Sequence, residues 1–143
     1  MKLYNIGNCL HRYKVPLLPK IINFLIRLIH NSAVFSETAI GKNTIFAYGG
    51  IGVVIHKRAK IGANCIIGSN VTIGGKSKSL NVPNIGDNCF IATGAKILGD
   101  VKIGNNCVIG ANSVVVSDIP DNSVVAGIPG KVIKSGINPK DYY

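Results

Sequence analysis

Aliphatic residues recur at every sixth position from residue 61 to residue 115, and this period constrains the fold more than any other feature of the sequence. The repeated positions are Ile61, Ile67, Ile73, Ser79, Ile85, Ile91, Ile97, Ile103, Ile109 and Val115, of which only Ser79 is not aliphatic. A period of six is not helical, and it continues for longer than any single strand. It is typical of a short strand followed by a corner, and three such units make one coil of a triangular β-solenoid.

Small residues and corner residues follow the same period. A small or β-branched residue comes four positions after most repeated aliphatics, as at Cys65, Val71, Cys89, Ala95, Val101, Cys107 and Ser113. Six Gly-x-Asn triplets, which begin at Gly41, Gly62, Gly68, Gly86, Gly104 and Gly110, suit corners where the backbone adopts positive φ. The repeat slips at residues 47–52, and the polar residues 74–84 are expected to form a loop. The three cysteines among the small residues are expected to fill the core.

Three segments of different character divide the chain. Residues 1–34 are expected to form a helical cap, because residues 17–30 are apolar almost all round and Pro19 suits a helix start. Residues 35–134 carry the repeat, and residues 135–143 are expected to be a polar tail. The helix is expected to cover the solenoid end or to pack against a neighbouring subunit. The alternative is a peripheral membrane contact through residues 17–30.

The formal net charge of +10 favours polyanionic partners such as a polyphosphate cofactor. The basic residues are dispersed, which argues against an arm dedicated to nucleic acid, so no nucleic-acid partner is expected. The cysteines show no metal-ligand spacing, and the N-terminus does not resemble a secretory signal. We therefore expect a reduced, cytoplasmic protein that holds no metal.

Residues 40–134 resemble the left-handed β-helix acyltransferases, also called the hexapeptide-repeat family. The segments that carry this resemblance are residues 49–56, 70–76, 94–99 and 122–133, and the last of these matches the terminal signature of the family. Within the family the chain is most similar to serine acetyltransferases and to short O-acetyltransferases of bacterial surface polysaccharides. The resemblance implies an all-β, left-handed parallel β-helix with a short N-terminal helix, assembled as a homotrimer.

The resemblance also implies a reaction and a set of binding residues. Acetyl-CoA would lie between adjacent solenoids, and a histidine would activate the acceptor hydroxyl without a metal. The positions that match the CoA-binding residues of the family are Gly75, Lys76, Thr93, Gly94, Ala111, Val116, Ser117, Lys131 and Lys134. The basic cluster Lys57, Arg58 and Lys60 could hold CoA phosphates, an acidic glycan or a nucleotide-linked sugar.

His56 is the candidate general base, because it is the only histidine within the repeat and follows an inward-facing Ile55. The chain departs from the serine acetyltransferases nearby, since their Asp-His dipeptide falls on Ala47-Tyr48 or on Tyr48-Gly49. Tyr48 is therefore the second residue to test at this position.

The sequence favours an acetyltransferase that acts on a hydroxyl of a small-molecule or glycan acceptor. A sugar of surface-polysaccharide (capsule or O-antigen) biosynthesis is the first expectation, and serine, as in cysteine biosynthesis, is the alternative. A catalytically inactive binding or scaffold protein is a further alternative. A zinc carbonic anhydrase on the same architecture is disfavoured, because one histidine in the repeat cannot supply three ligands.

Overall fold

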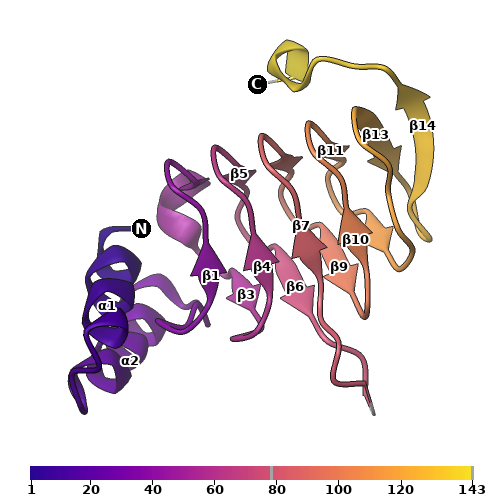
Figure 1. The fold of residues 1–143 in the computed structure, drawn as a ribbon. Coiled ribbons are helices and arrows are strands. Elements are labelled where there is room, and N and C mark those ends of the chain that lie inside the picture. The colour runs from indigo at the N-terminus through magenta and orange to yellow at the C-terminus, as the bar shows by residue number, and fades with distance from the viewer. Residues whose placement is uncertain (78, 143) are drawn as a thin grey trace.

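The computed structural model describes residues 1–77 and 79–142, which form a triangular β-solenoid with two helices at one end (Figure 1). Short strands build three parallel faces, joined by corners. Face 1 contains β1 (Ala39–Ile40), β4 (Lys60–Ile61), β7 (Asn84–Ile85) and β10 (Lys102–Ile103). Face 2 contains β2 (Ile45–Phe46), β5 (Ile66–Ile67), β8 (Phe90–Ile91), β11 (Val108–Ile109), β13 (Ser123–Ala126) and β14 (Lys131–Ser135). Face 3 contains β3 (Val54–Ile55), β6 (Thr72–Gly74), β9 (Lys96–Leu98) and β12 (Val114–Val115). The predicted left-handed parallel β-helix is confirmed.

The predicted inward positions form the core. Stacking of the coils places equivalent residues in register, as in the pairs Ile61↔Ile85 and Ile85↔Ile103. The buried aliphatic members of the repeat are Ile61, Ile67, Ile73, Ile85, Ile91, Ile97, Ile103, Ile109 and Val115. The strands from β3 to β12 thus turn the repeated aliphatic residue inward, and backbone groups of stacked strands pair between coils.

The corners between faces 1 and 2 show why glycine and asparagine recur together. The positive φ belongs to the asparagine, with φ of 55° at Asn64 and at Asn88. The glycine is needed for a different reason, since a Cβ on Gly62 would lie 2.5 Å from the backbone C and O of Gly86 in the next coil. The asparagine amides form a ladder through Asn43, Asn64, Asn88, Asn106 and Asn122, with N–O distances of 3.0–3.3 Å.

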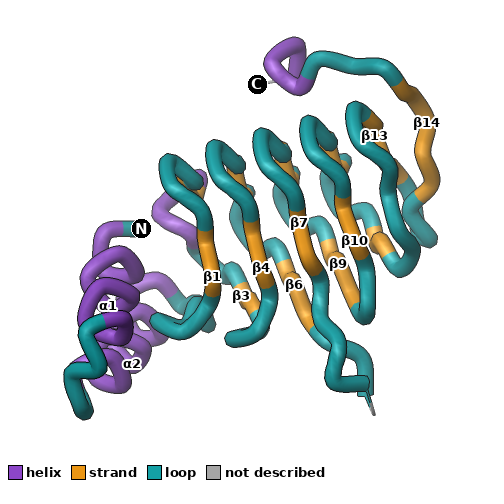
Figure 2. The backbone as a smooth tube through the Cα atoms, viewed as in Figure 1, coloured by secondary structure: helices purple, strands orange, loops and turns teal. Residues whose placement is uncertain are grey.

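The two predicted interruptions of the repeat are present. At the first, a 3-10 turn over Ala47–Gly50 contains Tyr48 and Gly49 at φ of 52° and 70°. At the second, a loop between β6 and β7 leaves the coil stack (Figure 2).

Two helices cover the first coil, where one was predicted. The predicted helix is α2 (Leu18–His30), and the additional one is α1 (Lys2–Arg12). The sequence of α1 includes Gly7 and two asparagines, which are poor helix formers, so packing must stabilise it. The Tyr4 hydroxyl donates to Thr38 O at 2.6 Å, and burial raises the pKa of Tyr4 to about 12.

The C-terminal residues that the structure describes pack against the solenoid. β14 turns back antiparallel to β13, and a 3-10 turn (Pro139–Tyr142) follows it. Ile137 is buried and packs with Val108 and Val124, so an apolar anchor holds this segment on face 2. Within residues 1–77 and 79–142, no helix is long and apolar enough to cross a membrane.

Candidate functional site

One group of predicted site residues lies at the corner between faces 3 and 1, which we call the 3–1 corner. His56 directly follows β3 in one coil, and Gly75 and Lys76 follow β6 in the next. Val116 and Ser117 follow β12 two coils further along. These side chains therefore form a column along one edge of the solenoid.

A second group lies at the corner between faces 2 and 3, the 2–3 corner. Thr93 and Gly94 occupy it in one coil, and Ala111 occupies it in the next, where Asn112 N donates to Thr93 O at 3.0 Å. Both backbone groups of Gly94 have partners, since its N–H donates to Ser69 O and its C=O accepts from Lys96 Nζ. A Cβ on Gly94 would collide with the Asn112 amide oxygen, so this glycine makes room for the next coil, while Thr93 offers its exposed hydroxyl to a ligand.

Face 3 separates the two corners, because each of its strands begins at the 2–3 corner and ends at the 3–1 corner. A ligand that touches both groups must either cross the outside of face 3 or take one corner from each of two chains. The second arrangement gives a groove with two walls, and concave sites bind small molecules better than flat faces do.

The two predicted phosphate-binding lysines are not brought together. Lys131 pairs with Ala126, at the end of β13 that reaches the 2–3 corner. Lys134 pairs with Val124, and its Nζ lies 6.0 Å from the centre of the Tyr142 ring. Lys131 therefore lies at the 2–3 corner, on the same edge of the solenoid as Thr93. Lys134 lies instead beside the C-terminal 3-10 turn.

His56 is half-buried beside a fully buried Ile55, which matches the predicted inward and outward positions. Its Nδ1 accepts the Arg58 backbone N–H at 3.1 Å. A neutral ring with this bond carries its proton on Nε2, so Nε2 is a donor. To accept a substrate proton, the imidazole needs a free nitrogen lone pair. It must therefore break the hydrogen bond between Nδ1 and the Arg58 N–H, with or without a rotation of the ring.

His30 was missed by the sequence analysis, and the fold brings it close to the position where serine acetyltransferases carry their Asp-His dipeptide. It is the last residue of α2, outside the repeat, and its Nδ1 lies 3.6 Å from where a Cβ on Gly49 would be. Among the residues that the structure describes, none forms a hydrogen bond with the His30 ring. No period in the sequence marks this residue; only the packing of α2 on the first coil does.

A shallow hollow of about 210 Å³ lies beside the His56 corner. Arg58 and Lys60 line it together with the loop before β7, and Asp100 closes one side. Asp100 accepts a hydrogen bond from Asn81 Nδ2 at 2.7 Å, which occupies one carboxylate oxygen. The guanidinium and ammonium groups suit a small anionic group such as a carboxylate.

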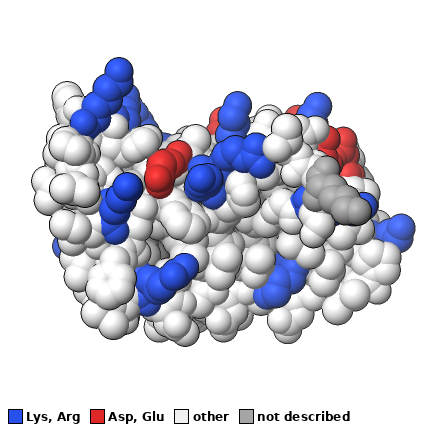
Figure 3. Space-filling view, turned by 90° about the horizontal axis from the view of Figure 1, so that it is seen from below, with Lys and Arg blue, Asp and Glu red and all other residues white. Residues whose placement is uncertain are grey.

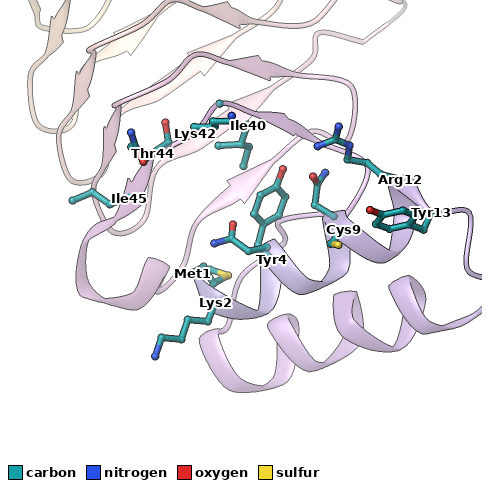
Figure 4. Close-up of a pocket in the computed structure, with 14 residues that line it drawn as sticks. Met1, Lys2, Tyr4, Cys9, Arg12, Tyr13, Ile40, Lys42, Thr44 and Ile45 are labelled. Atoms are coloured by element: carbon teal, nitrogen blue, oxygen red, sulfur yellow. The ribbon is translucent and has the colours of Figure 1, made fainter.

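A larger hollow lies elsewhere, between α1 and the first coil. It measures about 850 Å³, and Lys2, Arg12, Lys42 and Thr44 are among its lining residues (Figure 4). It includes none of the predicted site residues.

The buried cysteines form a column in the core and not a reactive group. Cys65, Cys89 and Cys107 are fully buried, and Cys89 Sγ contacts Gly104 O at 3.2 Å. The neighbouring thiols and burial raise the pKa of Cys89. Within the described parts of the chain, no group of three or more His, Cys, Asp or Glu residues could hold a metal ion.

Comparison with known proteins places this fold and sequence in one family. Residues 83–117 match the family model described as bacterial transferase hexapeptide (six repeats), and residues 58–76 match the hexapeptide repeat of succinyl-transferase. The chain belongs to the hexapeptide-repeat transferase family. The predicted resemblance is thereby confirmed.

This hexapeptide-repeat protein is similar to serine acetyltransferases over nearly its whole length. It is 36% identical to the enzyme of Synechococcus elongatus, over 97% of this chain and 59% of the relative. It is 39% identical to that of Bacillus subtilis, over 91% of this chain and 60% of the relative. The chain thus spans about three-fifths of the length of these relatives.

Solved structures give the same result. The serine acetyltransferase of Neisseria gonorrhoeae matches with a TM-score of 0.87 and 30% identity, over 95% of this chain and 54% of that one. A serine acetyltransferase in complex with CoA matches with a TM-score of 0.81 and 27% identity, over 92% of this chain and 54% of that one.

Proposed function

We propose that this protein transfers an acetyl group from acetyl-CoA to a hydroxyl of a small acceptor, and that the acceptor is L-serine. The observation that carries the proposal is the identity of 36% and more with serine acetyltransferases over at least nine-tenths of the chain. The similarity favours serine over the polysaccharide sugar that was the first expectation from the sequence.

The reaction needs a general base and an oriented thioester. The acetyl group passes directly to the acceptor, without a covalent intermediate on the enzyme. The base removes the proton of the acceptor hydroxyl while its oxygen attacks the thioester carbon. The C–S bond then breaks, and the CoA thiolate takes up a proton, so that an O-acetyl ester and free CoA result. Thr93, Gly94 and Ala111 would line the pantetheine arm, and Lys131 would meet phosphate.

A homotrimer would complete this arrangement. The candidate residues divide between the 2–3 and 3–1 corners, and a homotrimer would set the 2–3 corner of one chain against the 3–1 corner of the next. Gly75, Lys76, Val116 and Ser117 would then form the second wall of the groove. The particle mass from light scattering should equal three chains.

Two imidazoles are candidates for the general base. His56 lies in the repeat beside the basic hollow, and its use requires that Nδ1 give up the Arg58 N–H. His30 lies beside Gly49, where the ring is free of hydrogen bonds from the described residues. Because they flank opposite ends of β3, neighbouring chains of a trimer could bring one of each into a single groove.

The hollow at Arg58 and Lys60 supports an amino-acid acceptor. A serine carboxylate can form paired, charge-assisted hydrogen bonds with a guanidinium, whereas a neutral sugar has no negative charge to offer it. The absence of an Asp-His dipeptide at residues 47–49 is the specific observation that keeps a sugar hydroxyl as the second candidate.

Release of the CoA thiol, followed with a thiol-reactive dye, tests the acceptor. We expect turnover with acetyl-CoA and L-serine, and reduced turnover with serinamide, which lacks the carboxylate. Turnover with sugars and none with serine would establish the second candidate. No thiol release with any acceptor would refute the acetyltransferase and favour the scaffold reading.

Single variants at three histidines identify the base, since the chain offers a matched control. Loss of the base should lower kcat about 10²–10⁴-fold. This fall is expected for His56→Ala and His56→Asn if His56 is the base, and for His30→Ala if His30 is the base. The control is His11→Ala on the exposed side of α1, which should leave kcat unchanged. If both candidates retain more than about a tenth of the rate, neither is the base, and Tyr48→Phe is the next variant.

A further inference from the structure

The outward face of α2 carries a continuous apolar stripe. Ile22 and Ile26 point into the molecule and are buried, whereas Ile21, Phe24 and Leu28 are 52–69% exposed. The intervals of three and four residues place these three side chains on one side of the helix, opposite the buried pair. Leu17, which directly precedes the helix, is 70% exposed. Single exposed apolar residues are ordinary, but a stripe of large ones indicates a surface that another body covers.

The surroundings of the stripe are mainly basic. Lys20 and Arg27 are seven residues apart, so both lie along the same flank of α2. One carboxylate reaches this helix, since Glu37 accepts a hydrogen bond from Asn23 Nδ2 at 3.4 Å. At the helical end of the molecule, on the left of Figure 3, blue side chains and a red one lie among wide uncharged areas.

These two features together determine what can cover the stripe. A second copy docked face to face would bring together Lys20 and Arg27 of both copies, four positive charges against two Glu37 carboxylates, and the excess of like charge is repulsive where water is excluded. An anionic surface with an apolar interior complements both the stripe and its flank. Lysine and arginine stems can lie along the stripe while their charged ends reach the headgroups.

We propose that the outward face of α2 binds the surface of a membrane that contains anionic phospholipid. With 13 residues, α2 is about 20 Å long and the hydrocarbon core is about 30 Å thick, so the helix lies in the plane of the interface. Tyr13, 79% exposed at the turn before α2, suits the headgroup level. The solenoid extends from the helical end of the molecule (Figure 1), so its corners remain open to solvent-borne acetyl-CoA.

Flotation of the full chain with lipid vesicles tests the proposal. We expect binding to vesicles of phosphatidylcholine with phosphatidylglycerol, weak binding to phosphatidylcholine alone, and release by salt. The double variant Phe24→Ser, Leu28→Ser should lower the partition coefficient at least about tenfold. The double variant Lys20→Gln, Arg27→Gln should lower it about twenty-five-fold, at about fivefold for each charge.

Matched controls distinguish binding through α2 from vesicle binding caused by any exposed apolar side chain or by the net charge of the protein. Leu80→Ser removes an equally exposed apolar side chain from a loop, and Lys102→Gln removes a cation from β10. Both should bind vesicles like the parent chain, and circular dichroism should confirm that every variant is folded.

Equal affinity for both kinds of vesicle, or no affinity for either, would overturn the proposal. So would a doubling of the particle mass with protein concentration that the Phe24→Ser, Leu28→Ser variant abolishes, since a second copy would then cover the stripe. Vesicle binding requires no turnover, so its outcome is independent of the acetyltransferase proposal.

Discussion

Asn88 links two properties of the solenoid corner, and substitution can separate them. Its backbone has φ of 55°, and its side chain accepts from Asn64 Nδ2 at 3.3 Å and donates to Asn106 Oδ1 at 3.2 Å. Asn88→Gly removes the ladder bonds but tolerates the backbone conformation. Asn88→Ala removes the bonds and also forces a Cβ into the left-handed region.

The magnitudes follow from these contacts. Two partly exposed hydrogen bonds are together worth about 1–2 kcal/mol, and the left-handed conformation costs alanine about another 1–2 kcal/mol. We therefore expect losses of about 1–2 kcal/mol for Asn88→Gly and about 2–4 kcal/mol for Asn88→Ala. Asn88→Asp should cost less than Asn88→Gly, because aspartate also tolerates the left-handed region and its carboxylate can still accept from Asn64, although it cannot donate to Asn106.

Urea unfolding at one fixed protein concentration measures these free energies, provided that the m-value stays constant. Asn5→Ala is the control, since Asn5 is exposed on α1 and lies outside the ladder. If Asn88→Gly is as damaging as Asn88→Ala, the positive φ costs nothing, and the explanation of the Gly-x-Asn corner given above is wrong.

Two other measurements test alkaline stability and cofactor binding. Because burial raises the pKa of Tyr4 to about 12, the folded chain holds that proton more tightly than the unfolded chain, whose Tyr titrates near 10.0. The resulting stabilisation, about 2–3 kcal/mol, is complete below pH 10 and is lost towards pH 12; Tyr4→Phe should remove this pH dependence in urea titrations. Lys131→Ala should raise the KM for acetyl-CoA several-fold with kcat nearly unchanged. Lys134→Ala should have a smaller effect, because its ammonium group lies over Tyr142; equal effects in steady-state kinetics would contradict the separation of the two lysines.

The repeat made most of the solenoid predictable, because each coil obeys the same local rule. Inward Ile67 and Ile91 follow from the period alone, and so does the burial of Cys89 between them along the chain. The loop after β6 follows from the polar residues that break the period. A periodic fold is easier to predict than most, because every coil packs only on its neighbours and needs an inward aliphatic residue at the same position.

The rest depends on contacts between segments that no period connects. Gly7 lowers the helix propensity of α1, but a glycine is needed there, because a side chain at that position would collide with Ser36. The helix therefore depends on its packing, which no local pattern shows. His30 lies beside Gly49 only because α2 packs on the first coil, so the sequence does not indicate it as a candidate. The contact of the C-terminal residues with face 2 is not indicated by any period either, because it depends on one apolar residue, Ile137.

The reversal of the chain at β14 has a consequence for behaviour at high concentration. A parallel coil exposes on its last strand the same hydrogen-bonding pattern that it uses to bind the coil before it, so an uncovered solenoid can join end to end into filaments. On face 2 that pattern is taken up by β14, which runs antiparallel and carries Lys131 and Lys134. The helices lie against the first coil at the opposite end, so at both ends of the solenoid an element that does not continue the parallel coil opposes end-to-end stacking.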